Sequence, residues 1–101
     1  MMDFINKLGD VKKKMDEIKQ RLNAITVEGI AGNGLVKVVC TGNKKVQSVA
    51  IADELMATDK KEELQELLEV AINRAIEQAE QVSETEMKAA GRDFLPGMPG
   101  F

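Results

Sequence analysis

The residues best suited to bind a ligand are basic ones near the start of the chain. Apolar residues recur there at alternating steps of four and three, a heptad pattern that predicts a helix over residues 3–25. The recurring apolar residues form a stripe along this helix, which we call the apolar seam. If Leu8, Met15 and Leu22 occupy one of its two heptad positions, basic residues flank the seam on both sides. Such side chains can contact nucleic-acid phosphates. The candidates are Lys7, Lys12, Lys13, Lys14, Lys19 and Arg21.

The same basic residues have a second interpretation, which is pairing within the chain. An acidic helix is a better neighbour for this seam than a parallel copy of the same helix, because like charges would face each other in such a copy. Each exposed pair of this kind contributes little stability. The possible partners on a predicted C-terminal helix are Glu66, Glu69, Glu77, Glu80 and Glu84.

Other residues with chemical potential are few. The chain has no His and a single cysteine, Cys40, which excludes an internal disulfide, a zinc site of several Cys or His ligands, and a Ser-His-Asp arrangement. The acidic cluster of Glu62, Glu63, Glu66 and Glu69 is more typical of a solvated helix face, because no loop of alternating oxygen ligands accompanies it. We therefore expect no enzyme, no metal site and no cofactor.

Three short β-branched runs follow the first helix and predict an antiparallel meander. The runs are residues 26–31, 35–41 and 45–51, and the turns between them contain Gly32-Asn33-Gly34 and Gly42-Asn43. Glycine and asparagine tolerate the positive φ of tight turns. A strand follows the first glycine run, which argues against a phosphate-binding loop. A long helix is then expected from a cap at Asp59 to Ala90, ending at Gly91.

The middle strand is apolar on both faces. One layer of helices covers only one face, so the other needs a cover, and a second copy of the chain is the simplest one. The residues predicted for this homodimer interface are Leu35, Val39, Val49 and Ile51. The long helix would extend about 48 Å. It must therefore project beyond its own sheet, because a compact domain of this size has a radius of gyration of only about 13 Å.

The 101 residues are expected to form one α+β domain at residues 1–91, followed by a Pro/Gly-containing tail at residues 92–101. The domain has α-β(3)-α order, with a three-stranded antiparallel meander and two long helices. Its charge is uneven: residues 1–50 carry a net +4 and residues 51–101 a net −7, within an overall −3. No stretch approaches a membrane span and no signal peptide is visible, so we expect a reduced, cytoplasmic protein without membrane contact. The tail, with its apolar residues, is a candidate contact for other proteins.

Taken in order, these features closely resemble the YbaB/EbfC family of bacterial nucleoid-associated proteins over essentially the whole chain. The residues that carry the resemblance are Val27-Glu28-Gly29, the hairpin from Ala31 to Val38, Asn73 and Ala79 in the last helix, and the Leu95-Pro96-Gly97-Met98 tail. The resemblance implies a homodimer whose helices project as arms, located on the nucleoid. It also implies binding to double-stranded DNA that reshapes it, with effects on gene expression. Basic residues of the arms would make the contacts, which adds Lys88 and Arg92 to those of the first helix.

An alternative is a prefoldin-like small chaperone or another protein–protein interaction module, because two long helices joined by β hairpins also describe such subunits. They clasp clients between helix tips, where methionines such as Met15 and Met87 provide adaptable apolar contacts. Exposed apolar residues at the helix ends favour the client clamp, whereas exposed lysines favour DNA.

Overall fold

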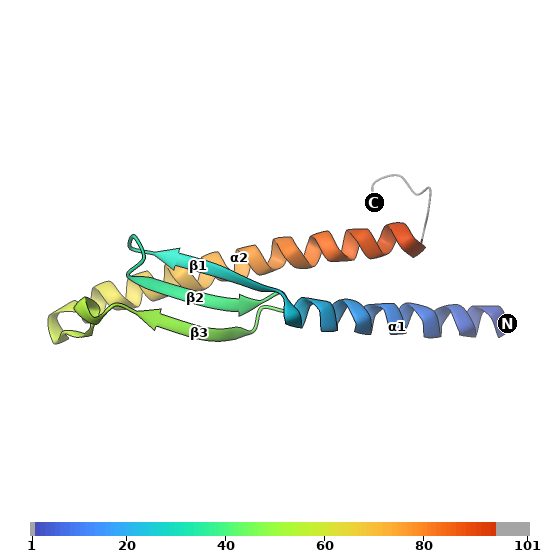
Figure 1. Ribbon diagram of the computed structural model, residues 1–101, viewed down its shortest axis with the longest axis horizontal. Coiled ribbons are helices and arrows are strands. Elements are labelled where there is room, and N and C mark those ends of the chain that lie inside the picture. Colours follow the sequence, from blue (N-terminus) through green and yellow to red (C-terminus); the bar gives the residue numbers. More distant parts are fainter. Residues whose placement is uncertain (1, 95–101) are drawn as a thin grey trace.

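The structure, a computed structural model, describes the backbone of residues 2–94 and the side chains of residues 9–91. The elements follow the expected α-β(3)-α order (Figure 1). They are α1 (Met2–Ala24), β1 (Thr26–Ala31), β2 (Val36–Thr41), β3 (Val46–Ile51), the 3-10 turns η1 (Asp53–Met56) and η2 (Thr58–Lys60), and α2 (Lys61–Phe94). The predicted α+β fold class is confirmed.

The three strands form one antiparallel sheet in the order β1-β2-β3, which confirms the predicted meander. The β1–β2 turn has positive φ at Gly32, Asn33 and Gly34, as its residue types predict. In the β2–β3 turn the positive φ lies at Lys44, at 67°, and not at the Gly-Asn pair before it.

Helix α2 packs across one face of the sheet, over β1 and β2. The fully buried side chains beneath it on β2 are Val36, Val38 and Cys40. Small residues on the helix allow its backbone to approach β1, where Gly29 lies against Ala71 and Ala75. A Cβ at position 29 would collide with the helix backbone, so this close approach requires glycine.

Helix α1 and the C-terminal part of α2 project beyond the sheet at the same end of the molecule (Figure 1). The molecule measures 66 × 24 × 17 Å, and its radius of gyration of 19.0 Å exceeds the value of about 13 Å for a compact chain of this length. Its 34 residues make α2 about 51 Å long. The predicted projection is confirmed, and we call the two projecting segments the arms.

Two predicted boundaries of α2 are wrong. The helix begins at Lys61, because Thr58–Lys60 forms a separate 3-10 turn where the Asp59 cap was expected. It also continues through Gly91 to Phe94. Glycine costs only about 1 kcal/mol inside a helix and is a weak stop, whereas a proline such as Pro96 disfavours helix at the residue before it. The predicted 92–101 tail therefore starts within the helix, and residues 95–101 lie outside the described part.

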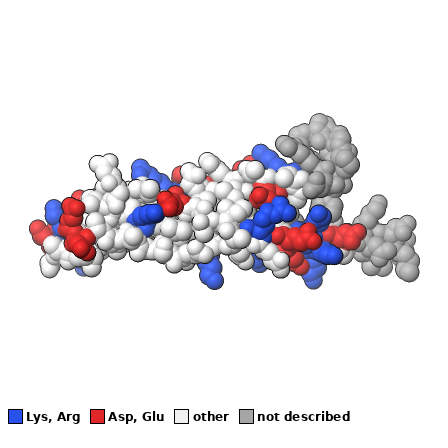
Figure 2. Space-filling model, viewed as in Figure 1, with Lys and Arg blue, Asp and Glu red and all other residues white. Residues whose placement is uncertain are grey.

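Two surfaces of the sheet have no cover from α2. On β3, Val46 and Val49 are 45% and 44% exposed. An irregularity in the β2–β3 register pairs them with Cys40 and Val38, so both lie on the helix-facing side, next to the area that α2 covers. On the outer face Ile30 is exposed, and the surface over the strands is mainly uncharged (Figure 2).

The four residues predicted for a dimer interface are not brought onto one surface. Leu35 and Ile51 are partly buried and pack against the core. Val39 lies on the outer face, because its neighbours along β2 point into the core, and Val49 lies on the helix-facing side. One flat interface with a second copy of the chain could therefore contain Val39 or Val49, but it could not contain both residues.

Candidate nucleic-acid interface

Helix α1 presents basic side chains along its described length. Between residues 9 and 24 only Ile18 and Leu22 are buried, and both lie near α2 and the β2–β3 turn. The predicted phosphate-binding residues of this stretch are all exposed: Lys12, Lys13, Lys14, Lys19 and Arg21. Lys7 and Arg92 belong to the two helices, but their side chains lie outside the described part. The arm thus offers cations to solvent, as phosphate contact requires.

The β2–β3 turn joins α1 firmly to the sheet. The backbone N–H of Gly42 donates to the carbonyl oxygens of Leu22 and Ile25, both at 3.0 Å. The Asn43 side-chain amide donates to the Lys19 carbonyl at 2.9 Å and to Asn23 Oδ1 at 2.6 Å. Among these acceptors, the Leu22 carbonyl is one of the last four of the helix, which have no partner within it. These hydrogen bonds set the direction in which the α1 arm leaves the sheet.

Ion pairs neutralise part of the basic surface. Arg21 Nη1 donates to Glu86 Oε2 at 2.8 Å. Lys14 Nζ lies 3.8 Å from a Glu17 oxygen on the same helix. For Lys12, Lys13 and Lys19, no carboxylate among the side chains of residues 9–91 lies within 4.0 Å. The predicted cations of α1 therefore differ in how far they are already compensated.

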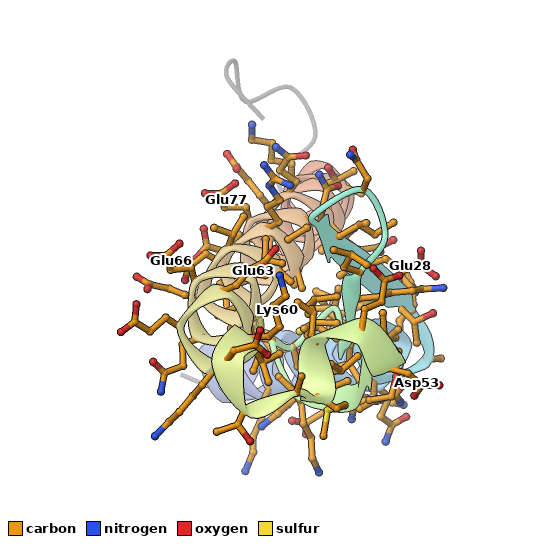
Figure 3. All side chains as sticks on the ribbon, turned by 90° about the vertical axis from the view of Figure 1, so that its left-hand side faces the viewer. Glu28, Asp53, Lys60, Glu63, Glu66 and Glu77 are labelled. Atoms are coloured by element: carbon orange, nitrogen blue, oxygen red, sulfur yellow. The ribbon has the colours of Figure 1, made fainter. Side chains whose placement is uncertain are left out.

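The alternative of extensive pairing between α1 and α2 reduces to one described pair. Its acid, Glu86, was not among the predicted partners. Glu80 pairs with Lys44 of the β2–β3 turn at 3.5 Å, and Glu84 pairs with Lys88 within α2 at 3.2 Å. Glu66 and Glu77 point away from the strands on the outer side of α2, where they meet solvent (Figure 3).

Sequence reasoning missed two basic residues at the base of the arms, Lys44 and Lys45. Both are exposed and lie in the turn that is bonded to the end of α1. The sequence contained the information needed to predict their position. In a meander the second turn lies at the end of the sheet where the first strand begins, and here β1 directly follows the first helix. The positive surface of α1 thus continues onto the sheet.

A hollow of about 260 Å³ lies between the arms at their base. It is lined mainly by Met15, Ile18, Leu22 and Met87, with Lys19 and Ser83 among its polar residues. Met15 and Met87 are 44% and 40% exposed. The inner sides of the arms are therefore partly apolar, as the prefoldin-like alternative requires, while their edges carry lysines.

The opposite end of the molecule is acidic (Figure 2). Glu63 there lies 3.6 Å from Lys60, and the two side chains approach each other in Figure 3. Within the described side chains, no three His, Cys, Asp or Glu residues converge where a metal ion could bind. Cys40 is buried in the core, and burial raises the pKa of its thiol, so this residue is kept as a neutral thiol.

Comparison with known proteins identifies the family. The profile of the YbaB/EbfC DNA-binding family matches residues 1–94. The chain belongs to this family. Over its full length it is 35% identical to a nucleoid-associated protein of Flavobacterium johnsoniae, of which it covers 93%. It is 43% identical over 94 residues to a nucleoid-associated protein of an Exiguobacterium species, a match that covers 91% of this chain and 82% of the relative.

The solved structures agree on the fold of this YbaB/EbfC chain. An uncharacterized protein from Helicobacter pylori matches it with a TM-score of 0.74 at 22% sequence identity, over 90% of this chain and 92% of the other. Family membership supports DNA binding in general and an association with the bacterial nucleoid. In residues 2–94, neither helix combines the length and hydrophobicity needed to cross a membrane.

Proposed function

We propose that this chain is a non-enzymatic, homodimeric protein of the bacterial cytoplasm that binds duplex DNA on the nucleoid through lysine and arginine side chains of its helical arms. The observation that carries the proposal is the row of exposed lysines on α1, a helix that projects beyond the sheet. One group of acidic side chains lies at the end of the molecule away from these lysines, while others lie among the basic side chains of the arms (Figure 2). The overall charge of −3 therefore does not prevent the arms from approaching phosphate.

The mechanism is contact with the phosphate backbone and release of its counterions. Residues 9–91 contain no aromatic residue, so this part of the chain offers no platform for stacking of unpaired bases. Lysine contacts to phosphate position a protein on the duplex without reading its sequence. Two pairs of arms on a dimer would hold two segments of the backbone at a set spacing, which changes the path of the DNA and, through it, gene expression.

The proposed dimer rests on the uncovered part of the sheet. Val46 and Val49 leave an apolar strip on β3, and η1 next to it in the chain exposes 66% of Met56. β3 is also an edge strand, with one row of backbone groups unpaired. We propose that a second copy of the chain covers this strip, because its own β3 offers the same apolar strip and strand edge, and a twofold contact pairs identical surfaces.

A DNA titration tests the binding proposal. The purified protein is titrated against a fluorescent duplex of random sequence at three salt concentrations. We expect the logarithm of the association constant to fall linearly with the logarithm of salt concentration, by about 0.9 for each phosphate contacted. A protein that binds no duplex even at low salt would refute DNA binding by this chain.

Light scattering tests the dimer independently of DNA. The mass at micromolar concentration should be twice 11.1 kDa. The variant Val49→Glu should shift the mass toward the monomer, because it places a charge in the apolar strip, whereas Met87→Glu on the arm should leave the mass unchanged. A monomeric wild type, or equal effects of the two substitutions, would remove the proposed interface.

A client clamp is the second candidate, and the apolar hollow between the arms is the observation that favours it. Suppression of aggregation of an unfolded model protein is the readout. In that case Met15→Ser with Met87→Ser should abolish protection while DNA binding is retained. Under the leading proposal, the wild type gives no protection.

A further inference from the structure

The two basic edges of α1 look equivalent in the sequence but not in the structure. Residues seven apart lie on one edge of a helix, about 10.5 Å apart. We call Lys14 and Arg21 the paired edge, and Lys12 and Lys19 the open edge. The edges flank the apolar seam on its two sides, so one duplex cannot make equal contact with both.

The paired edge is already compensated by carboxylates. Arg21 is held by Glu86 of the α2 arm at 2.8 Å, and Lys14 lies 3.8 Å from Glu17. A phosphate that approached this edge would have to displace one carboxylate and would be repelled by both. The net charge of these four groups is zero, so few counterions would be released from DNA by contact with them.

The open edge has no such partner among the described side chains, and the fold extends it. Asn43 bonds to the Lys19 carbonyl and to Asn23, and so places the β2–β3 turn next to the open edge. Beyond it, a hollow of about 450 Å³ is lined by Asn23, Thr41, Lys45, Val46 and Gln47. Its amides and exposed lysine are groups that contact phosphates in protein–DNA complexes, whereas the Thr41 hydroxyl is buried and accepts hydrogen bonds from the backbone N–H groups of Asn43 and Lys45.

We infer that duplex DNA lies along the open edge and continues over the β2–β3 turn, with Lys12, Lys19 and Lys45 as its phosphate contacts. This inference rests on the proposed DNA binding. Lys12 and Lys19 lie about 10.5 Å apart along α1, far enough for each lysine to contact a separate phosphate. Two carboxylates lie between these lysines in the sequence. Glu17 pairs with Lys14, whereas Asp16, four residues after Lys12 and three before Lys19, opposes DNA on this edge.

Two triple variants with the same loss of charge test the inference. The open-edge variant is Lys12→Ala, Lys19→Ala and Lys45→Ala, and its matched control is Lys14→Ala, Arg21→Ala and Lys88→Ala. The open-edge variant should reduce the slope of log affinity against log salt by about 2.7, which is three contacts of about 0.9 each. The control should reduce the slope by less than one contact. Circular dichroism confirms that both variants remain folded.

Two single substitutions, Lys45→Ala and Asp16→Asn, test the contacts of the open edge, and Lys61→Ala is the control. Lys45→Ala should lower the slope by about 0.9, whereas Lys61→Ala at the acidic end should leave it unchanged. Asp16→Asn should strengthen binding at low salt. If the two triple variants lose affinity equally, or the control loses more, the open edge is refuted while DNA binding stands. If the wild type binds no duplex, the proposed function itself fails.

Discussion

Arg21 and Glu86, 65 residues apart in the chain, form an ion pair of 2.8 Å that joins the last turn of α1 to the α2 arm. Glu86 lies two turns beyond Ala79, on the stripe of α2 that packs on the sheet through Ala71 and Ala75. Beyond the sheet, the same stripe of α2 faces α1. At that point Glu86 takes the place of the small apolar residues. Its side chain is only 22% exposed, against 57% for Arg21.

Removing this pair should free Arg21 on the paired edge, away from the proposed DNA. In Glu86→Gln the free energy of unfolding should fall by less than about 1 kcal/mol, because the arginine is largely solvated. DNA affinity at low salt should rise less than in Asp16→Asn, because the freed Arg21 lies on the paired edge and the proposed DNA lies along the open edge. Glu77→Gln, at an exposed position of the same helix, is the matched control, and chemical denaturation with the DNA titration gives both readouts. A rise in Glu86→Gln that exceeds the rise in Asp16→Asn would instead place the DNA on the paired edge.

Two glycine substitutions should have opposite effects on stability. Gly29→Ala places a methyl group against the backbone of α2 at Ala71 and Ala75, so the helix must move away from the sheet. We expect a loss at or above the upper end of the roughly 1–3 kcal/mol of overpacked cores. Gly9→Ala lies in α1, where no described atom lies within 4 Å of the new methyl, and should stabilise the protein by about 0.5–1 kcal/mol. Thermal melts compare them; a stable Gly29→Ala would contradict the close approach.

Asn43 should control the attachment of the α1 arm. Asn43→Ala removes two hydrogen bonds to the last turn of α1 and should cost about 1 kcal/mol. Hydrogen exchange should speed up in that turn and not in the core of the sheet. Asn23→Ala removes only one of the two bonds and serves as the graded control. Equal exchange in the wild type and both variants would mean that the Gly42 backbone bonds alone hold the arm.

The Cys40 thiol should make stability depend on alkaline pH. Burial raises its pKa in the folded state above the ordinary value of 9.0. The folded protein therefore holds the proton more tightly than the unfolded chain, and stability is lost as the pH rises from the unfolded toward the folded pKa. Urea unfolding between pH 8 and pH 10 measures this, with Cys40→Ala as the reference. Parallel pH profiles for the two proteins would contradict a buried, neutral thiol.

Much of the fold could be predicted because its signals are local and periodic. The heptad of α1, the β-branched runs and the glycine turns each report on neighbours within a few residues. The errors fall where local signals are weak. Gly91 is a mild helix stop that α2 passes through, and the 3-10 turn at Thr58–Lys60 replaces the expected cap.

The candidate site was predictable as a list of cations but not as a surface. A heptad places Lys12 and Arg21 on equivalent edges of one helix. Only the packing of α2 brings Glu86 to Arg21 and leaves Lys12 without a described carboxylate partner. Likewise, a period of two would put Val46 and Val49 on opposite faces of β3, whereas the irregular register puts them on the same one.

The sequence by itself therefore determined the order of the elements, the apolar seam, the uneven charge and, through resemblance, the family. The tertiary structure decided which basic edge remains uncompensated, that Lys45 extends it, and which part of the sheet stays uncovered. The reason is physical: helix and strand patterns depend on the spacing of adjacent residues. Charge compensation and burial instead depend on contacts between segments far apart in the chain, such as Arg21 with Glu86 and Asn43 with Lys19.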